Sequence, residues 1–147
     1  MLMPTKILVP TDFSEYSDRA LKQALDIAKQ YGAKVYVVHV LHEKNPYDTS
    51  DGTIPSYYED IEKQMTEAAR KKMQEEINEF PQAKELEVFT EVVNGNTSDA
   101  IMEEERSKGI DLIVIASLGR SGIAKYLIGS VARNVLKGAK CPVLLTK

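Results

Sequence analysis

The sequence has one cysteine, no tryptophan and no long apolar run among its 147 residues. The lone Cys141 excludes an internal disulfide and is typical of a reducing compartment, so we expect a cytoplasmic protein. No apolar stretch approaches the roughly 20 residues needed to span a bilayer, and residues 1–6 lack a signal-peptide pattern. The length of 147 residues predicts a single domain, residues 1–147, and the lack of a long apolar run predicts no membrane partner.

A large excess of either charge is also absent, because the net charge is only -3 at pH 7. Broad attraction to nucleic acid is therefore not expected, and any anion-binding site must be local. The patterns G-x-x-x-x-G-K-[ST] and G-x-G-x-x-G are both missing, so neither a P-loop NTPase nor a dinucleotide-binding dehydrogenase is supported. The apolar share of 43% and the charged share of 28% are those of a globular domain.

The chain does contain a regular alternation of short apolar segments and helical repeats. Apolar segments, mostly rich in β-branched residues, predict five buried strands, at 6–10, 35–41, 87–93, 112–116 and 142–146. Apolar residues three and four apart predict four helices between them. These run from a Ser14 cap to Gly32, over 58–80, from a Thr97 or Ser98 cap to Gly109, and from Ser130 to about Gly138.

Some finer expectations accompany this pattern. Tyr31 and Leu136 should lie on the buried faces of their helices, and the charged face of the long helix should be solvated. Residues 43–57 contain Pro46, Gly52 and Pro55, which predicts a loop that is either mobile or functional.

Strands that alternate with helices predict a five-stranded parallel α/β sheet with helices on both faces. Right-handed crossovers favour the strand order 3-2-1-4-5, in which the chain reverses direction between the first and fourth strands. Ligands bind at such a switch point, beyond the carboxyl ends of the strands. The polar turn after Pro10 and the segment from Ala116 to Ser130 should therefore meet there.

The segment that follows the fourth strand is rich in glycine. Gly119, Gly122 and Gly129 allow backbone N–H groups to approach a ligand closely, and a helix begins at Ser130. A helix N-terminus offers unpaired N–H groups and a partial positive charge, which together suit a phosphate. The alternative interpretations without a ligand are that the glycines form ordinary turns, that Asp12 is only a helix cap and that Arg120 is a solvated loop charge.

Residues 6–14, 38–40 and 119–144 together resemble the universal stress protein family. Gly119, nine further residues, Gly129 and Ser130 match most of that family's ATP-binding motif, Gly-x2-Gly-x9-Gly-Ser/Thr. The first glycine of the motif is replaced by Ala116, and Phe13 stands where the family often has glycine. An alanine is tolerated at this position if the backbone is extended, but it distorts the site if the backbone needs a positive φ.

The resemblance implies an adenine nucleotide alpha hydrolase-like, Rossmann-like sandwich that binds ATP, or AMP or ADP, in a regulatory stress response. A Mg²⁺ or Mn²⁺ ion would be held through the phosphates, with no metal ligands of the protein's own. By resemblance, Pro10, Thr11, Asp12 and Val40 line the adenine and ribose end, and the missing first glycine places Ala116 near the ribose. The implied phosphate side comprises Gly119, Arg120, Gly122, Gly129, Ser130 and Val131.

Two alternatives remain at this point. A slow ATP hydrolase would need a residue that orients water, and Asp12, the only candidate, is expected at the wrong end of the nucleotide. An interaction module that binds no nucleotide is favoured by Ala116. Family members pair through the last strand, so all three hypotheses predict a homodimer through residues 142–146. His39 and His42 are expected to be structural or exposed.

Overall fold

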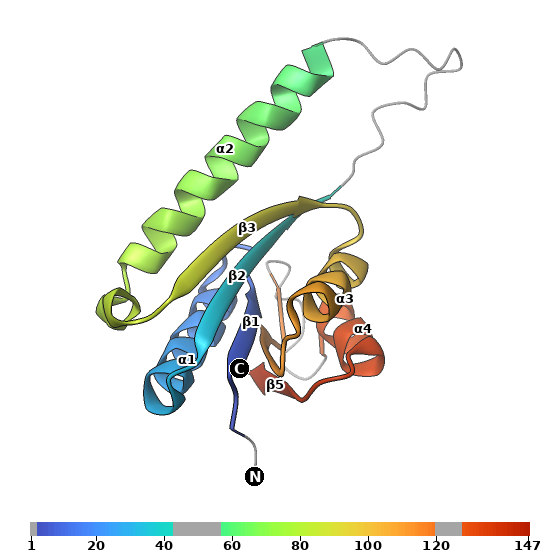
Figure 1. Cartoon of the computed structure of the whole chain (residues 1–147). Helices are drawn as coiled ribbons and strands as arrows, with labels where there is room; N and C mark the ends of the chain where they lie inside the picture. Colours follow the sequence, from blue (N-terminus) through green and yellow to red (C-terminus); the bar gives the residue numbers. More distant parts are fainter. Residues whose placement is uncertain (1–2, 43–56, 120–127) are drawn as a thin grey trace.

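The computed structural model describes residues 3–42, 57–119 and 128–147, and these form one open α/β sheet with helices on both faces (Figure 1). The strands are β1 (Lys6–Pro10), β2 (Lys34–Leu41), β3 (Val88–Asn94), β4 (Leu112–Ala116) and β5 (Val143–Thr146). The helices are α1 (Glu15–Tyr31), α2 (Tyr57–Asn78), α3 (Thr97–Lys108) and α4 (Ser130–Gly138), with a 3-10 helix, η1 (Pro81–Glu85).

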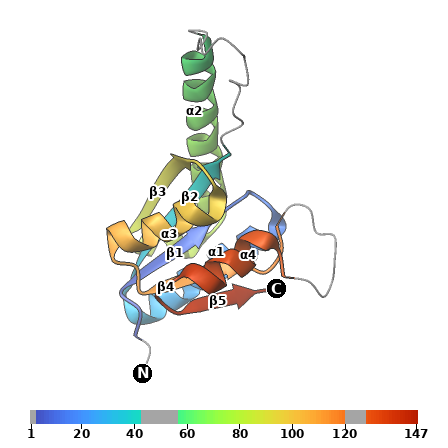
Figure 2. The ribbon, with the colours of Figure 1, turned by 90° about the vertical axis from the view of Figure 1, so that its right-hand side faces the viewer.

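All strand pairs are parallel, and the strand order is β3-β2-β1-β4-β5, as the sequence predicts. Helices α1 and α2 cover one face of the sheet and α3 and α4 cover the other, and Figure 2 shows the second pair from the side. In β1, Ile7, Leu8 and Val9 are fully buried. Because the chain order reverses between the neighbouring strands β1 and β4, the switch point lies where these two strands end. They are also the two most buried strands.

Local signals explain most element ends. Ser14 caps α1 by accepting a hydrogen bond from the Ser17 N–H, and Gly32 ends this helix in the left-handed region at φ 71°. The predicted cap of α3 was wrong, because the Asn96 side chain accepts the hydrogen bond from Asp99 N–H, and neither Thr97 nor Ser98 is the cap. An amide oxygen outcompetes the two later hydroxyls because Asn96 lies one residue before the helix.

Other predictions also need correction. Tyr31, the last residue of α1, is 45% exposed, and Leu136 is 41% exposed. The buried face of α4 is formed by Ala132 and Val135, and Leu136 lies outside it. Residues 81–85, between the predicted helix and the predicted third strand, form a 3-10 helix that begins with proline. Tyr57 is the first residue of α2 instead of the last residue of the loop. The rest of the predicted 43–57 loop, residues 43–56, lies outside the described residues.

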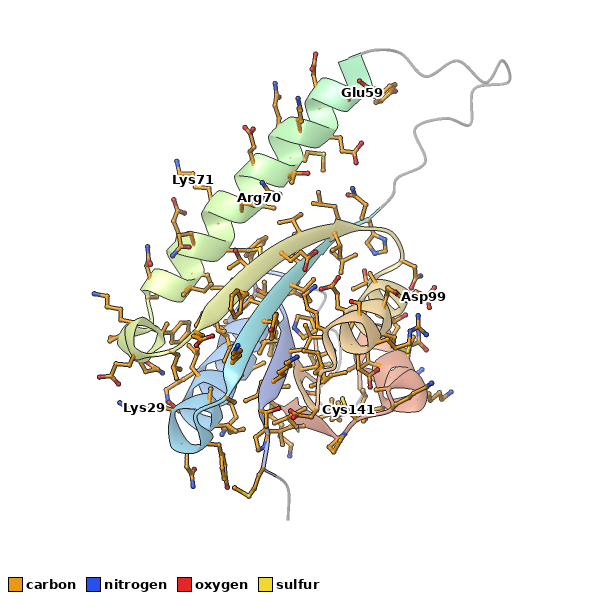
Figure 3. The ribbon with its side chains drawn as sticks, in the orientation of Figure 1. Lys29, Glu59, Arg70, Lys71, Asp99 and Cys141 are labelled. Atoms are coloured by element: carbon orange, nitrogen blue, oxygen red, sulfur yellow. The ribbon has the colours of Figure 1, made fainter. Side chains whose placement is uncertain are left out.

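Helix α2 extends past the sheet (Figures 1 and 2). Ala69 and Met73 are buried, but Ile61 and Met65, nearer the start of the helix, are 42% and 51% exposed. The charges of Glu59, Arg70 and Lys71 stand along this helix in solvent (Figure 3), as the sequence predicts for its charged face. No helix in the described ranges combines the length and apolar character needed to cross a membrane.

Candidate functional site

The turn after β1 is held by the side chain of Thr11, which is only 5% exposed. Its N–H donates to Val38 O at 2.8 Å and extends the ladder between β1 and β2. Its Oγ1 lies 2.9 and 3.0 Å from the two carboxylate oxygens of Glu76 and 3.2 Å from Ser17 Oγ. Its carbonyl oxygen lies 2.8 Å from His39 Nδ1. Thr11 therefore fixes the turn, since each of its polar groups already has a protein partner.

Phe13 has a φ of 64°, and it is the one non-glycine residue in the described ranges with a positive φ. This conformation favours glycine, which explains why a glycine would suit this position. The Phe13 N–H donates to Thr11 Oγ1 at 3.1 Å, and its ring packs on His39 at a centroid distance of 4.4 Å. Lys72 Nζ lies 5.3 Å from the ring centroid. Side-chain contacts thus hold a strained backbone in place.

Asp12 joins this turn to the segment that follows β4. Its Oδ1 accepts a hydrogen bond from Ser14 N–H at 2.9 Å. Its Oδ2 would lie 3.1 Å from a Cβ atom built on Gly119, so the two segments are in close contact. The structure therefore brings together residues 12 and 119, as the predicted strand order requires. Glycine at 119 leaves the Asp12 carboxylate room that a methyl group would take.

Gly129, which precedes α4, contacts the chain just after β4. Its N–H donates to Ser117 O at 2.7 Å, and its carbonyl accepts from Arg133 N–H at 3.0 Å in the first turn of α4. A Cβ atom at Gly129 would lie 3.3 Å from Ser117 O, so any larger residue would press on this backbone oxygen. Gly129 is also the N-cap of α4 and has no side chain to offer, so α4 begins without a side-chain cap. Such a helix start carries donors and partial positive charge.

The other predicted site residues lie at or near the ends of three strands, in the first turn of α4, or outside the described residues. Ala116 is the last residue of β4, pairs with Thr146 and has no positive φ, so its extended backbone does not require glycine. Val40 lies near the end of β2, and Val131, which follows the exposed Ser130, lies in the first turn of α4. Pro10 ends β1. Arg120 and Gly122 lie outside the described residues.

Glu76 is the residue at this site that the sequence analysis missed, because it was counted with the solvated charges of α2. It is only 7% exposed, and burial raises its pKa to about 7, opposed by the Thr11 hydrogen bond and aided by the charges of Asp18, Asp12 and Glu79. The available signal was its spacing: Glu76 lies three residues after Met73 and four before Phe80, on the apolar stripe.

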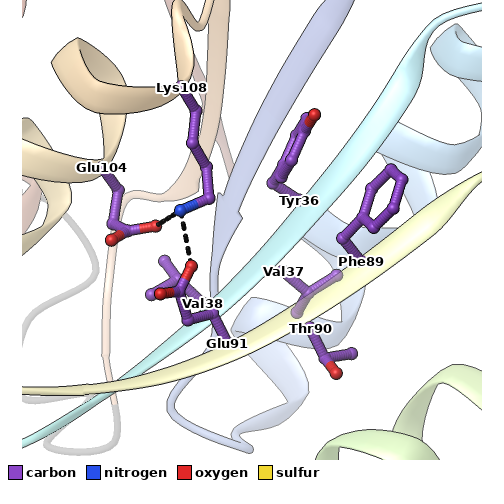
Figure 4. Close-up of a pocket in the computed structure, with 8 residues that line it drawn as sticks. All are labelled: Tyr36, Val37, Val38, Phe89, Thr90, Glu91, Glu104 and Lys108. Atoms are coloured by element: carbon purple, nitrogen blue, oxygen red, sulfur yellow. Dashed lines mark ion pairs between the residues drawn. The ribbon is translucent and has the colours of Figure 1, made fainter.

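Two hollows lie away from these residues. One, of about 240 Å³, is lined by the stacked rings of Tyr36 and Phe89 and by Lys108, which pairs with Glu91 and Glu104 (Figure 4). The other, of about 430 Å³, lies between the end of β3 and α3. Neither hollow is lined by a residue that the sequence predicts for the nucleotide site. In the described ranges no group of three or more His, Cys, Asp or Glu side chains could hold a metal ion.

These features define a doubly wound α/β protein in which two polar turns meet at the switch point of the sheet. Three comparisons extend this description. The family model described as "Universal stress protein family" matches residues 3–147, and the chain belongs to that family. Universal stress protein MJ0531 of Methanocaldococcus jannaschii is 36% identical over 146 residues, which cover 97% of this chain and 81% of the relative.

Solved structures agree with this assignment. The structure of MJ0577 from the same organism, described as a hypothetical protein in a test case of structural genomics, has a TM-score of 0.83 and 29% identity. That match covers 99% of this chain and 97% of the other. A universal stress protein in complex with cAMP matches with a TM-score of 0.68 and 25% identity, covering 99% of this chain and 98% of the other.

Proposed function

We propose that this protein binds an adenine nucleotide, ATP in the first place, and acts as a nucleotide-dependent regulator in a stress response. The observation that carries the proposal is the contact between the Asp12 turn and Gly119, beside the uncapped start of α4. Acceptors for a ribose and donors for a phosphate then lie at one end of the sheet. A relative of the same family that was solved with cAMP supports an adenine nucleotide as the class of ligand.

The proposed assignment follows the chemistry of each residue. Asp12, Pro10 and the Val40 backbone face the adenine and ribose, with Ala116 next to the ribose, and Thr11 holds the turn. The phosphates lie against Gly119, Gly129 and the first turn of α4, where Ser130 adds a hydroxyl and Val131 an N–H group. Arg120 and Gly122, which lie outside the described residues, are assigned to the phosphate side by the resemblance, and the Arg120 charge would offset phosphate charge. A Mg²⁺ or Mn²⁺ ion would bind to phosphate oxygens and water.

The fit of a phosphate rests on the donors present. The helix start lacks a side-chain cap in the described structure, and the exposed Ser130 is its first residue. The two glycines keep the surrounding backbone close together, since a Cβ atom at either would press on Asp12 or Ser117. This arrangement suits an anion that accepts N–H hydrogen bonds, and the bound nucleotide would supply that charge.

The test has two parts. Purified protein is denatured and the released small molecules are identified by mass spectrometry, and ATP with Mg²⁺ is then titrated calorimetrically. We expect bound adenine nucleotide or saturable binding, and a Ser130→Ala variant that binds about tenfold more weakly. Thr97→Ala, at the first residue of α3, is the matched control and should bind like the wild type. Absence of binding at millimolar ATP would refute the proposal.

We also propose a homodimer formed through β5. This strand lies at the edge of the sheet, and its Leu144 side chain is 37% exposed. An uncovered apolar edge strand favours pairing with a second copy. Light scattering should give a dimer for the wild type and a monomer for Leu144→Lys, and a monomeric wild type at all concentrations would contradict the proposal. With its lone Cys141, the protein is expected to work in the reducing cytoplasm.

A further inference from the structure

Glu76 is the buried titratable group that the proposed nucleotide site does not use. Its carboxyl oxygens lie 3.0 and 2.9 Å from Thr11 Oγ1, and the side chain is 7% exposed. None of the ion pairs within residues 3–42, 57–119 and 128–147 includes it. A buried carboxylate without a cation is costly, so burial favours the protonated form of Glu76, and the Thr11 hydrogen bond opposes this effect.

The proton on the Thr11 hydroxyl has two possible acceptors. Ser17 Oγ lies 3.2 Å away and donates its own proton to Ser14 O at 3.0 Å, so it can accept from Thr11. Protonated Glu76 can donate to Thr11 Oγ1, which leaves the Thr11 proton for Ser17. Ionised Glu76 takes that proton instead, and the contact between Thr11 and Ser17 loses its donor. Protonation of Glu76 therefore keeps the hydrogen bond from Thr11 to Ser17, and ionisation removes it.

The cluster is connected to the site through two residues. Thr11 Oγ1 also accepts the Phe13 N–H, which helps to hold Phe13 at its positive φ. Asp12 lies between Thr11 and Phe13, and its carboxylate contacts the position of Gly119. A change in the hydrogen bonds of the Thr11 hydroxyl therefore acts on both neighbours of Asp12.

The groups around Glu76 come from every element that packs on it. Asp18 lies on α1, Asp12 in the turn, and Glu79 on α2 itself, and each of these carboxylates opposes ionisation of Glu76. Lys72, one turn earlier on α2, lies over the Phe13 ring, and His39 of β2 contacts the Thr11 carbonyl. An anionic ligand beside Asp12 would add a further negative charge and favour the protonated form.

We propose that Glu76 is a proton-sensitive positioning residue, which holds the Thr11–Phe13 turn in its binding form when protonated and weakens nucleotide binding when ionised. The inference rests on the proposed function, since it concerns regulation of the same site. Two effects act in the same direction: protonation keeps the hydrogen bond between Thr11 and Ser17, and it removes a negative charge near an anionic ligand. The protein would then bind its nucleotide more tightly when the pH falls.

The test measures ATP affinity, with Mg²⁺, from about pH 6 to about pH 8 in the wild type and in Glu76→Gln. Titration of ATP itself cancels in the ratio of the two affinities. We expect wild-type affinity to fall about fivefold relative to Glu76→Gln across this range. Glu75→Gln removes an exposed charge from the same helix and should follow the wild type.

A second readout needs no ligand. The backbone amide of Phe13 should shift in ¹H–¹⁵N spectra with a midpoint near pH 7 in the wild type and in Thr11→Ser, and not in Glu76→Gln. Equal pH profiles for ATP binding in the wild type and Glu76→Gln would overturn this inference alone, and so would a Phe13 amide that does not titrate. Absence of ATP binding in all variants would overturn the proposed function as well.

Discussion

The central strands β1 and β4 lie side by side, and a carboxyl group forms hydrogen bonds at each end of this pair. The pKa values of the two carboxyl groups are shifted in opposite directions. At the amino end, Asp111 accepts hydrogen bonds from the N–H groups of Thr5 and Lys6 at 3.0 Å and from the Thr5 hydroxyl at 2.5 Å. Burial there opposes ionisation, but these hydrogen bonds lower the pKa of Asp111. At the carboxyl end, burial raises the pKa of Glu76.

The difference separates stability from function. At the amino end, the lowered pKa of Asp111 favours its ionised form, so its hydrogen bonds contribute to stability at neutral pH. The carboxyl end contains a carboxyl group whose pKa is raised to about 7 and, next to it, the positive φ of Phe13. Strain and unfavourable charge are thus concentrated where we propose that the nucleotide binds, as is common at functional sites.

Thr11→Val should give the largest effect, because it removes the hydrogen bonds at the carboxyl end of the strand pair. The substitution keeps the shape but removes the hydroxyl that serves Glu76 and Phe13, leaving a buried carboxyl group without its partner. We expect the free energy of unfolding to fall by about 3 kcal/mol, measured by urea denaturation at neutral pH. Thr11→Ser should lose about 1 kcal/mol or less. A valine variant as stable as the wild type would show that the hydroxyl does not hold the turn.

Asp111→Ala tests the amino end. It removes the acceptor of several hydrogen bonds at a partly exposed site, so we expect a loss of about 2 kcal/mol at neutral pH. The folded-state pKa of Asp111 lies below the usual 3.8, so its contribution is complete above pH 3.8 and is lost as the pH falls through the folded-state pKa. Urea denaturation in acid and at neutral pH measures both effects, and a deficit that persists in acid would contradict the account.

Glu76→Gln should show the opposite pH dependence and sharpen the comparison. The folded-state pKa is raised from 4.5 to about 7, so the stability contributed by the protonated group is complete below 4.5 and is lost as the pH rises to about 7. We expect the variant to exceed the wild type in unfolding free energy by about 2 kcal/mol near pH 8 and to equal it near pH 4. Chemical denaturation at the two pH values decides, and a difference independent of pH would count against a neutral Glu76.

Phe13→Gly and Phe13→Ala together measure the strain at the carboxyl end. Both variants lose the ring that packs on His39, but only glycine adopts the positive φ at little cost. The glycine variant should therefore be more stable than the alanine variant by about 1 kcal/mol. Thermal denaturation of the pair gives this difference, and an alanine variant of equal stability would mean that the backbone carries no strain.

Ala116→Gly should have the smallest effect. Because Ala116 is extended in β4, glycine offers no conformational gain there, and stability should fall by about 0.5 kcal/mol. ATP affinity measured by calorimetry should change by less than about twofold, since a methyl group on extended backbone needs no positive φ. A variant that gains ATP binding absent from the wild type would favour the interaction module without a nucleotide.

Most elements and their ends followed from the sequence because their causes are local, and the strand order followed from right-handed crossovers between parallel strands. β-branched segments, three- and four-residue spacings, Ser14 and Gly32 each act within a few residues. The same reasoning brought the turns after β1 and β4 together, since the order of parallel strands fixes which ends are neighbours.

The parts that the sequence did not predict depend on contacts between distant residues. Glu76 is 65 positions from Thr11, so its burial depends on how α2 packs on the sheet. The tie between Asp111 and Thr5 spans 106 positions, and a conformation such as that of Phe13 is held by His39 and Thr11 against its own preference. Charge on a helix face predicts exposure only when no partner reaches it.

The most direct test of the nucleotide site is a ¹H–¹⁵N titration of the assigned protein with ATP and Mg²⁺. We predict that the amides of Asp12, Gly119 and Ser130 shift together with one dissociation constant, because both turns contact the same molecule. Shifts confined to another region, such as the hollow at Tyr36 and Phe89, would contradict the account, as would no shift at millimolar ATP.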